Sequence, residues 1–183
     1  IKRLGDKEPS VRTAAAEALG NLGDKLAVKP LLKHIGVSIF SSRENVRKFA
    51  GVRVAAAQAL GNLGDKSAVE PLIKRLGDSE PSVRAAAAQA LGKLGDKRAI
   101  GLLSKKATDN NPEVRRAVAQ ALGDFGDKQI AQPLVDGLSN GHSGVRQAAD
   151  QSLRKLGVPK EQIVDGYIKA LSSPDPNVRI AAA

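Results

Sequence analysis

Residues 73–96 read IKRLGDSEPSVRAAAAQALGKLGD, and residues 1–24 nearly repeat them as IKRLGDKEPSVRTAAAEALGNLGD. The two segments differ at four of 24 positions. A Val-Arg pair marks the same point in every copy, with arginines at Arg12, Arg53, Arg84, Arg115, Arg146 and Arg179. Successive arginines from Arg53 to Arg146 are 31 residues apart. We therefore interpret the chain as about six repeats of that length.

Each repeat has the sequence signals of two helices. In the third repeat Pro81 suits the first position of the second helix, and Gly95 suits the left-handed residue that ends it. The apolar stripe of that helix is Val83, Ala87, Ala90, Leu91 and Leu94. Asp96 then precedes the first helix of the next repeat as an N-cap. Because every repeat follows this plan, we predict an all-α fold of about six stacked antiparallel helix pairs.

One helix pair cannot bury its own apolar face, so neighbouring repeats have to stack against one another. We therefore predict a single domain over residues 1–183, cut within a repeat at both ends. The alanine runs, such as 85–88, allow close helix contact, which fits a chain that is 42% hydrophobic and 2% aromatic.

Composition excludes several classes of protein. With no Cys among 183 residues, disulfides and zinc–thiolate sites are excluded. No apolar run approaches the roughly 20 residues that cross a bilayer, so we expect a soluble, cytoplasmic protein without a membrane segment. We expect no cofactor and no metal, and we interpret His34 and His142 as solvated surface residues. The net charge of +10 predicts a partner with an acidic surface.

Residues 37–51, VSIFSSRENVRKFAG, are an insertion that breaks the repeat spacing. Ser41 and Glu44 have the spacing of a capping box, which predicts that the second helix here starts near Ser42 and is extended by about two turns. The insertion is either a local plug or a protruding contact made by Ile39, Phe40, Arg43, Arg47 and Lys48.

The repeat resembles the HEAT-like repeat type named after phycobilisome bilin lyases. The residues that carry the resemblance are Asp78, Pro81, Val83, Arg84, Ala90, Leu91, Gly92, Leu94, Gly95 and Asp96, with Ala68, Val69, Pro71 and Leu72 before them. The resemblance implies a right-handed α-solenoid whose second helices line a concave binding face. In the HEAT-like enzyme that hydroxylates deoxyhypusine, His-Glu pairs hold iron. Neither histidine here is followed by Glu, which excludes that activity.

Three arginines follow an aspartate by six residues: Asp6 and Arg12, Asp78 and Arg84, Asp109 and Arg115. In HEAT-like repeats such a pair resembles a structural ladder that ties the inter-helix turn to the second helix. The other interpretation is a row of guanidinium groups that bind phosphates. Asn140 and Ser173 replace the aspartate before Arg146 and Arg179, which predicts a weaker ladder there. Arg53 has no acid at that spacing.

The positions two, six and ten after each valine share a side of the second helix that faces away from the apolar stripe. The candidate contact residues at these positions are Thr13, Glu17, Asn21, Val54, Gln58, Asn62, Gln89, Lys93, Arg116, Gln120, Asp124, Gln147, Gln151 and Lys155. The middle row has glutamine in four successive repeats. We interpret it either as neutral surface or as a hydrogen-bonding track for an extended partner.

The sequence therefore predicts a scaffold that binds another protein on its concave face and is not an enzyme by itself. One alternative, implied by the resemblance alone, is a bilin lyase or chromophore-chaperone subunit. The other is a weak binder of nucleic-acid backbone, since the aromatic residues needed for base stacking are few and lie outside the rows.

Overall fold

The computed structural model describes residues 1–36 and 47–182, and the chain divides into two compact units, Ile1–Ala99 and Ile100–Ala183. In the described residues every regular element is an α-helix or a short 3₁₀ turn, which confirms the all-α prediction.

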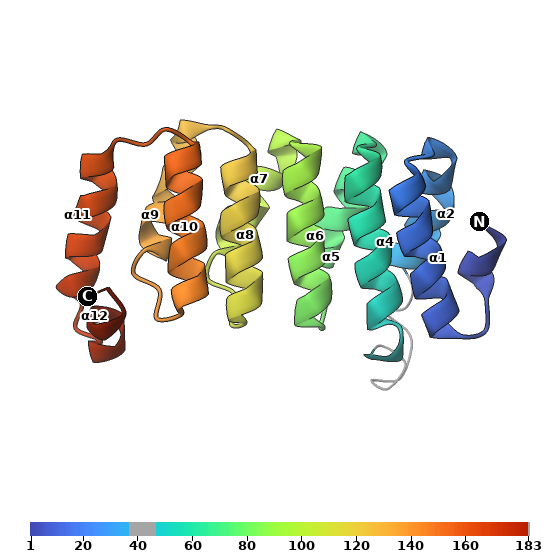
Figure 1. Cartoon of the computed structure of the whole chain (residues 1–183), viewed down its shortest axis with the longest axis horizontal. Helices are drawn as coiled ribbons and strands as arrows, with labels where there is room; N and C mark the ends of the chain where they lie inside the picture. Colours follow the sequence, from blue (N-terminus) through green and yellow to red (C-terminus); the bar gives the residue numbers. More distant parts are fainter. Residues whose placement is uncertain (37–46, 183) are drawn as a thin grey trace. The chain divides into compact units, whose positions relative to one another are not determined.

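Unit 1 is a two-layer stack of helices. Its second helices lie side by side in one layer, α1 against α4 and α4 against α6, with the first helices behind them (Figure 1). The helices of unit 1 are α1 (Pro9–Leu22), α2 (Val28–Ile35), α4 (Ala50–Leu63), α5 (Val69–Arg75) and α6 (Pro81–Leu94). Helix α2 packs on α4 and α5 packs on α6, so the two helices of a repeat cover each other.

Unit 2 repeats the same arrangement. Helix α8 packs against α10, while α7 and α9 lie behind them and pack on α8 and α10 respectively (Figure 1). The helices of unit 2 are α7 (Ile100–Lys106), α8 (Pro112–Asp124), α9 (Ala131–Gly137), α10 (Ser143–Lys155), α11 (Lys160–Leu171) and α12 (Pro176–Ala182). Helix α11 contacts both α9 and α10, so it continues the stack at its end.

The predicted start and stop signals are used as expected. Helix α6 begins at Pro81, and its C-cap Gly95 has a φ of 61°. The glycines at the same point of the other repeats also have left-handed backbone: Gly23, Gly64, Gly126 and Gly157. A side chain is disfavoured at this conformation, so glycine fixes the point where each second helix turns back.

The stripe predicted in α6 is the core of its repeat. Val83, Ala87 and Leu91 are fully buried, and Ala90 and Leu94 are buried as well. The neighbouring helix comes very close to this stripe, because a Cβ built on Gly61 of α4 would lie 2.8 Å from the Ala90 Cα atom. The small residues of the repeat therefore set the spacing between second helices, which is the role we predicted for the alanine runs.

Helix α4 has 14 residues, like α1 and α6, and begins at Ala50 with Phe49 as its N-cap. The chain turns at Phe49, and Arg47 and Lys48 just before it are again helical. The predicted starting point near Ser42 lies outside the described residues, so the extension of this helix through the insertion stays a prediction.

No helix in the described part of the chain is long and apolar enough to span a membrane.

Candidate functional site

The candidate contact residues lie on the side of the second helices that their neighbours leave uncovered. We call this set the outer face. None of its members is buried. Its exposed members are Glu17, Asn21, Gln58, Asn62, Lys93, Asp124, Gln147, Gln151 and Lys155, and its half-buried members are Thr13, Val54, Gln89, Arg116 and Gln120.

The glutamine row keeps its hydrogen-bonding groups free. Gln58 and Gln89 lie on the adjacent helices α4 and α6 of unit 1, and Gln120 and Gln151 lie on α8 and α10 of unit 2. Within residues 1–36 and 47–182 none of these four amides has a hydrogen-bond partner. Each amide has one acceptor oxygen and two N–H donors. The pair α4 and α6 of unit 1 and the pair α8 and α10 of unit 2 therefore each present two unused amides.

Unit 1 also has a hollow on this face. It has a volume of about 190 Å³ and lies between α1 and α4, lined by Glu17, Asn21, Ala55, Gln58, Ala59 and Asn62. Four of these residues are members of the outer face, and all four carry a carboxylate or an amide. The two alanines are buried, and Ala59 packs closely against Gly20 of α1. Four side chains that the sequence analysis predicted as contact residues therefore line one hollow.

The third row, at the position ten residues after each valine, connects neighbouring helices. Lys93 Nζ of α6 donates to Asn62 Oδ1 of α4 at 2.7 Å, and Lys155 Nζ of α10 meets Asp124 Oδ1 of α8 at 2.5 Å. In both pairs the partners are 31 residues apart, one repeat. Two of the cations on the face are therefore already engaged, and Arg116 is bound to Glu113 of its own helix.

The first row, at the position two residues after each valine, offers fewer free polar groups to a ligand. Thr13 uses its hydroxyl to donate to the Pro9 carbonyl at 3.0 Å, and Val54 is apolar and half-buried. Gln147 of α10 is exposed. The middle row is thus the part of the outer face with the largest number of free polar groups.

The predicted contact of the insertion is described only in part. Arg47 and Lys48 are exposed, and Arg47 Nε lies 3.8 Å from Glu80 Oε1. Ile39, Phe40 and Arg43 lie outside the described residues. Phe49, at the end of the insertion, lies under the guanidinium of Arg12, whose Cζ atom is 4.3 Å from the ring centroid.

The predicted ladder exists, but its chemistry differs from our prediction. Arg84 Nη1 donates to the backbone carbonyl of Asp78 at 2.9 Å, and Arg115 Nη1 donates to that of Asp109 at 2.7 Å. Arg146 and Arg179 bind the carbonyls of Asn140 and Ser173 at 2.8 and 2.7 Å. The contact is as short at asparagine and serine as at aspartate, so the expected weakening is wrong: the arginine binds the main chain, whose carbonyl every residue has. Among the described residues Arg12 makes no bond to Asp6, and its Nε is buried without a partner.

The aspartate side chain instead joins successive repeats, a contact that our sequence reasoning missed. Arg53 Nε and Nη2 donate to the two carboxylate oxygens of Asp78, each at 3.0 Å, and both side chains are at least 95% buried. Arg75 Nη1 adds a third contact at 3.4 Å. The signal was a spacing of 25 residues, which Arg115 and Asn140 share.

The turn aspartates cap helices, as predicted. Asp24, Asp65, Asp96 and Asp127 each accept a hydrogen bond from the backbone N–H two residues later, at 2.8 to 3.1 Å. Asp96 is also bound by the Arg98 guanidinium. That side-chain bond, with the backbone N–H of Arg98, lowers the pKa of Asp96 from 3.8 to about 2. The hydrogen bonds give all four carboxylates a structural role at the start of a helical turn.

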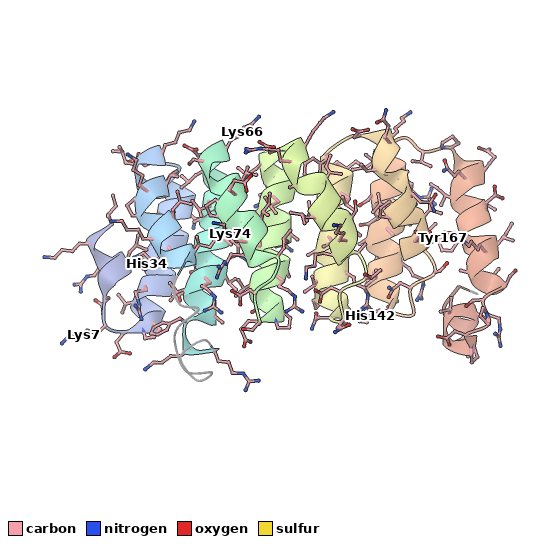
Figure 2. All side chains as sticks on the ribbon, turned by 180° about the vertical axis from the view of Figure 1, so that it is seen from behind. Lys7, His34, Lys66, Lys74, His142 and Tyr167 are labelled. Atoms are coloured by element: carbon pink, nitrogen blue, oxygen red, sulfur yellow. The ribbon has the colours of Figure 1, made fainter. Side chains whose placement is uncertain are left out.

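His34 is not the solvated histidine that we expected. It is half-buried near the end of α2, and its Nδ1 is buried with no partner in the described part of the chain. Burial, followed by the positive charges of Arg12 and Lys33, lowers the pKa of His34 below 6.5. Figure 2 shows His34 in unit 1 and His142 in unit 2, with Lys66 and Lys74 on the same view. Across the described residues, no three His, Cys, Asp or Glu side chains are grouped so that they could hold a metal ion.

Comparison with known families explains the 31-residue plan. A family model described as HEAT repeats matches residues 45–108 and 102–164, and a second one, HEAT repeat, matches residues 1–26. The chain belongs to the HEAT-repeat family. The matches span most of both units, and they agree with the stacked helix pairs. The comparison with curated proteins gave no match.

Solved structures with the same fold include a natural lyase and a designed protein. In the complex of CpcE and CpcF of phycocyanin lyase from Nostoc sp. PCC7120, one chain is 28% identical, with a TM-score of 0.73, over 99% of this chain and 72% of that chain. The Escherichia coli protein YibA has a TM-score of 0.69 and 22% identity, over 99% of this chain and 66% of its own. A designed armadillo repeat protein has a TM-score of 0.62 and 19% identity, over 99% and 94%. The last two show the fold alone.

Proposed function

We propose that this HEAT-repeat chain is a scaffold that binds another protein through the outer face of its second helices. The observation that carries the proposal is the row of Gln58, Gln89, Gln120 and Gln151, whose amides have no partner within the described residues. Within each unit two glutamines of the row stand on adjacent helices, α4 and α6 in unit 1 and α8 and α10 in unit 2. In unit 1 these helices are in close backbone contact at Gly61 and Ala90, so little backbone freedom is lost when a ligand binds there.

The chemistry of the row suits an extended segment of polypeptide. Each main-chain unit of such a segment offers one N–H donor and one carbonyl acceptor, and each glutamine amide can satisfy both. The hollow between α1 and α4, with Glu17, Asn21 and Asn62 around Gln58, adds a place for a side chain of the partner. Recognition would then combine main-chain hydrogen bonds with one seated side chain.

The net charge of the whole chain favours an acidic partner more strongly than the charge of the outer face does. The outer face holds three cations, Lys93, Arg116 and Lys155, against two acids, Glu17 and Asp124. Exposed lysines of the first helices, Lys29, Lys33 and Lys74, contribute more to the total of +10. Long-range attraction to this charge would bring an acidic protein close, and the amide row would then hold it.

A peptide-display selection tests this proposal. The full chain is used to select binders from a library of random linear peptides, and the affinity of the enriched peptides is measured for Gln58→Ala, Gln151→Ala and the matched control Gln162→Ala. Gln162 is an exposed glutamine of α11 that lies outside the outer face. Loss of one amide should weaken binding about fivefold, the equivalent of one hydrogen bond of about 1 kcal/mol.

Two results would reject the protein-binding proposal. One is a set of peptides that lose the same affinity with Gln162→Ala as with Gln58→Ala. The other is an absence of enriched peptides together with binding of nucleic acid whose affinity falls steeply as salt rises, which is the behaviour of a backbone binder.

A second candidate is a bilin lyase subunit, which the likeness to a phycocyanin lyase chain favours at 28% identity and a TM-score of 0.73. In such a role the arginines of the second helices would hold the propionate groups of the bilin. Arg84, Arg115 and Arg146 are instead bound to turn carbonyls, which argues against their use in this way. Absorbance of a bilin mixed with the purified chain tests the role, and an unchanged spectrum would reject it.

A further inference from the structure

An arginine of one second helix contacts the turn before the next second helix, and we call this contact the junction between repeats. The residue that the arginine contacts differs between the two units. In unit 1 Arg53 binds both carboxylate oxygens of Asp78, from Nε and Nη2, each at 3.0 Å. In unit 2 the same place is taken by Arg115 and Asn140, also 25 residues apart. Arg115 Nη2 donates to Asn140 Oδ1 at 3.2 Å, and Arg115 Nε is buried without a partner among the described residues. An amide offers one acceptor oxygen where a carboxylate offers two, so the junction of unit 2 lacks one acceptor.

Asn140 is also followed directly by a glycine, Gly141, in an open turn. Gly141 is exposed, and a Cβ built on it would meet nothing within 4 Å. Glycine has no side chain to hinder attack by its own backbone nitrogen on the preceding asparagine. The other described asparagines precede bulkier residues: Leu22 after Asn21, Leu63 after Asn62, Asn111 after Asn110, Pro112 after Asn111 and Val178 after Asn177.

The hydrogen bonds at Asn140 favour the same reaction. Its Oδ1 accepts from Arg115 Nη2 and, at 3.1 Å, from the backbone N–H of His142. This oxygen becomes negatively charged when a nucleophile attacks the amide carbon. Two fixed donors, one of them on a cation, stabilise that charge as it develops.

We propose that Asn140 is a site of spontaneous deamidation and that the aspartate formed completes the junction with Arg115. The backbone nitrogen of Gly141 loses its proton and attacks Cγ of Asn140. The Cγ–N bond of the amide breaks, ammonia leaves, and a five-membered succinimide remains. Water then adds to one of its two carbonyls and opens the ring, which gives Asp or isoaspartate at position 140. The new carboxylate of Asp supplies the acceptor that Arg115 Nε lacks, as Asp78 does for Arg53.

The reaction is tested by ageing the full chain at mildly alkaline pH beside a free peptide of residues 137–144. Peptide mapping by mass spectrometry should find a gain of about 1 Da, the difference between amide and carboxyl, at position 140 and none at Asn21, Asn62 or Asn110. Gly141→Ala should leave the fold intact, because its Cβ meets open space, and should slow the reaction at least about tenfold by hindering attack. If residue 140 is still Asn when the free peptide is half converted, the site is rejected.

The consequence for the junction is tested by thermal unfolding. Asn140→Asp should raise Tm by about 4 °C if one charged hydrogen bond is gained. Aged wild-type protein should move toward the same value, with more Asp relative to isoaspartate than the free peptide gives. In Arg115→Gln, the substitution Asn140→Asp should no longer raise Tm. Deamidation without any rise in Tm, in aged protein and in Asn140→Asp, would overturn the role in the junction.

Discussion

Arg53 and Asp78 are both charged and both almost fully buried, with side chains 1% and 5% exposed. Hydrogen bonds stabilise this buried pair: two of 3.0 Å join the guanidinium to the carboxylate, and Arg75 adds a third contact. The pair connects α4 to the turn before α6, so it acts between repeats and not within one. Removal of Asp78 would take from Arg53 and Arg75 the carboxylate that both contact, and loss of one partner of a buried ion pair is strongly destabilising.

Asp78→Ala should therefore lower the free energy of unfolding by about 3–5 kcal/mol, measured by urea denaturation of the full chain. Asp78→Asn should cost less, because it recreates the one-acceptor junction of Arg115 and Asn140. Glu70→Ala is the control, since Glu70 and Arg98 form an exposed pair with side chains 60% and 56% exposed. Its loss should cost less than about 1 kcal/mol. Equal losses in Asp78→Ala and Glu70→Ala would contradict the account.

His34 gives unit 1 a defined response to pH. Its pKa is lowered by burial, Arg12 and Lys33 in the folded state, while the unfolded value is near 6.5. Below pH 6.5 the unfolded chain takes up a proton at His34 that the folded chain does not, so stability falls as pH falls until the folded pKa is passed. Unfolding midpoints at pH 7.5 and 5.5 should therefore differ more in the wild type than in His34→Gln. An equal difference in both proteins would show that His34 is not responsible.

At the scale of the helix, close contact between small residues decides which substitutions are tolerated. A Cβ on Gly61 would lie 2.8 Å from the Cα of Ala90, which is main chain and cannot move aside easily. Gly61→Ala should therefore destabilise the protein by about 1–3 kcal/mol, although alanine favours helices. Gly101→Ala in α7 is the matched control, because nothing lies within 4 Å of its Cβ position. It should stabilise by about 0.5–1 kcal/mol in the same urea measurement. A stabilising Gly61→Ala would contradict close stacking.

Most of the helices could be predicted from the repeat, and the failures have local causes. Pro81 and Gly95 begin and end α6 as expected, because their effects depend on backbone conformation alone. The extension predicted from the Ser41–Glu44 pattern stays a prediction, because those residues lie outside the described part of the chain; α4 itself begins at Ala50, after a turn at Phe49. Leu22 is 74% exposed although Leu63 and Leu94, at the same point of their repeats, are buried. Burial depends on the neighbouring repeat, which a single repeat sequence does not include.

At the scale of the whole molecule, the repeat spacing indicated stacked helix pairs, and the motif around Pro81, Val83 and Arg84 indicated the resemblance to HEAT-like repeats. The Arg53–Asp78 junction has a regular spacing of 25 residues, but only the stacked helices show that these residues of different repeats are in contact. The outer face was predicted from helical periodicity, and its members are exposed or half-buried as a surface requires. A partner is not encoded in the periodicity, so the function of the face is a proposal.

The net charge of +10 leads to a kinetic prediction. For an acidic peptide ligand the association rate constant should fall about tenfold between about 20 and about 500 mM salt, because salt screens long-range attraction. The dissociation rate constant should change much less, since the amide row makes uncharged hydrogen bonds. Stopped-flow or surface-based kinetics measures both. A salt effect confined to dissociation would show that charge acts within the bound complex and not in steering.

Site-specific photo-crosslinking shows whether a bound peptide lies on the outer face. A photoreactive amino acid is placed at Gln58 on the outer face of α4, or at Lys33, which is exposed on α2 of the same unit, and each protein is irradiated with a peptide selected on the full chain. We expect a cross-link from position 58 that is competed by excess unlabelled peptide, and none from position 33. Efficient cross-linking from position 33, with none from position 58, would contradict it.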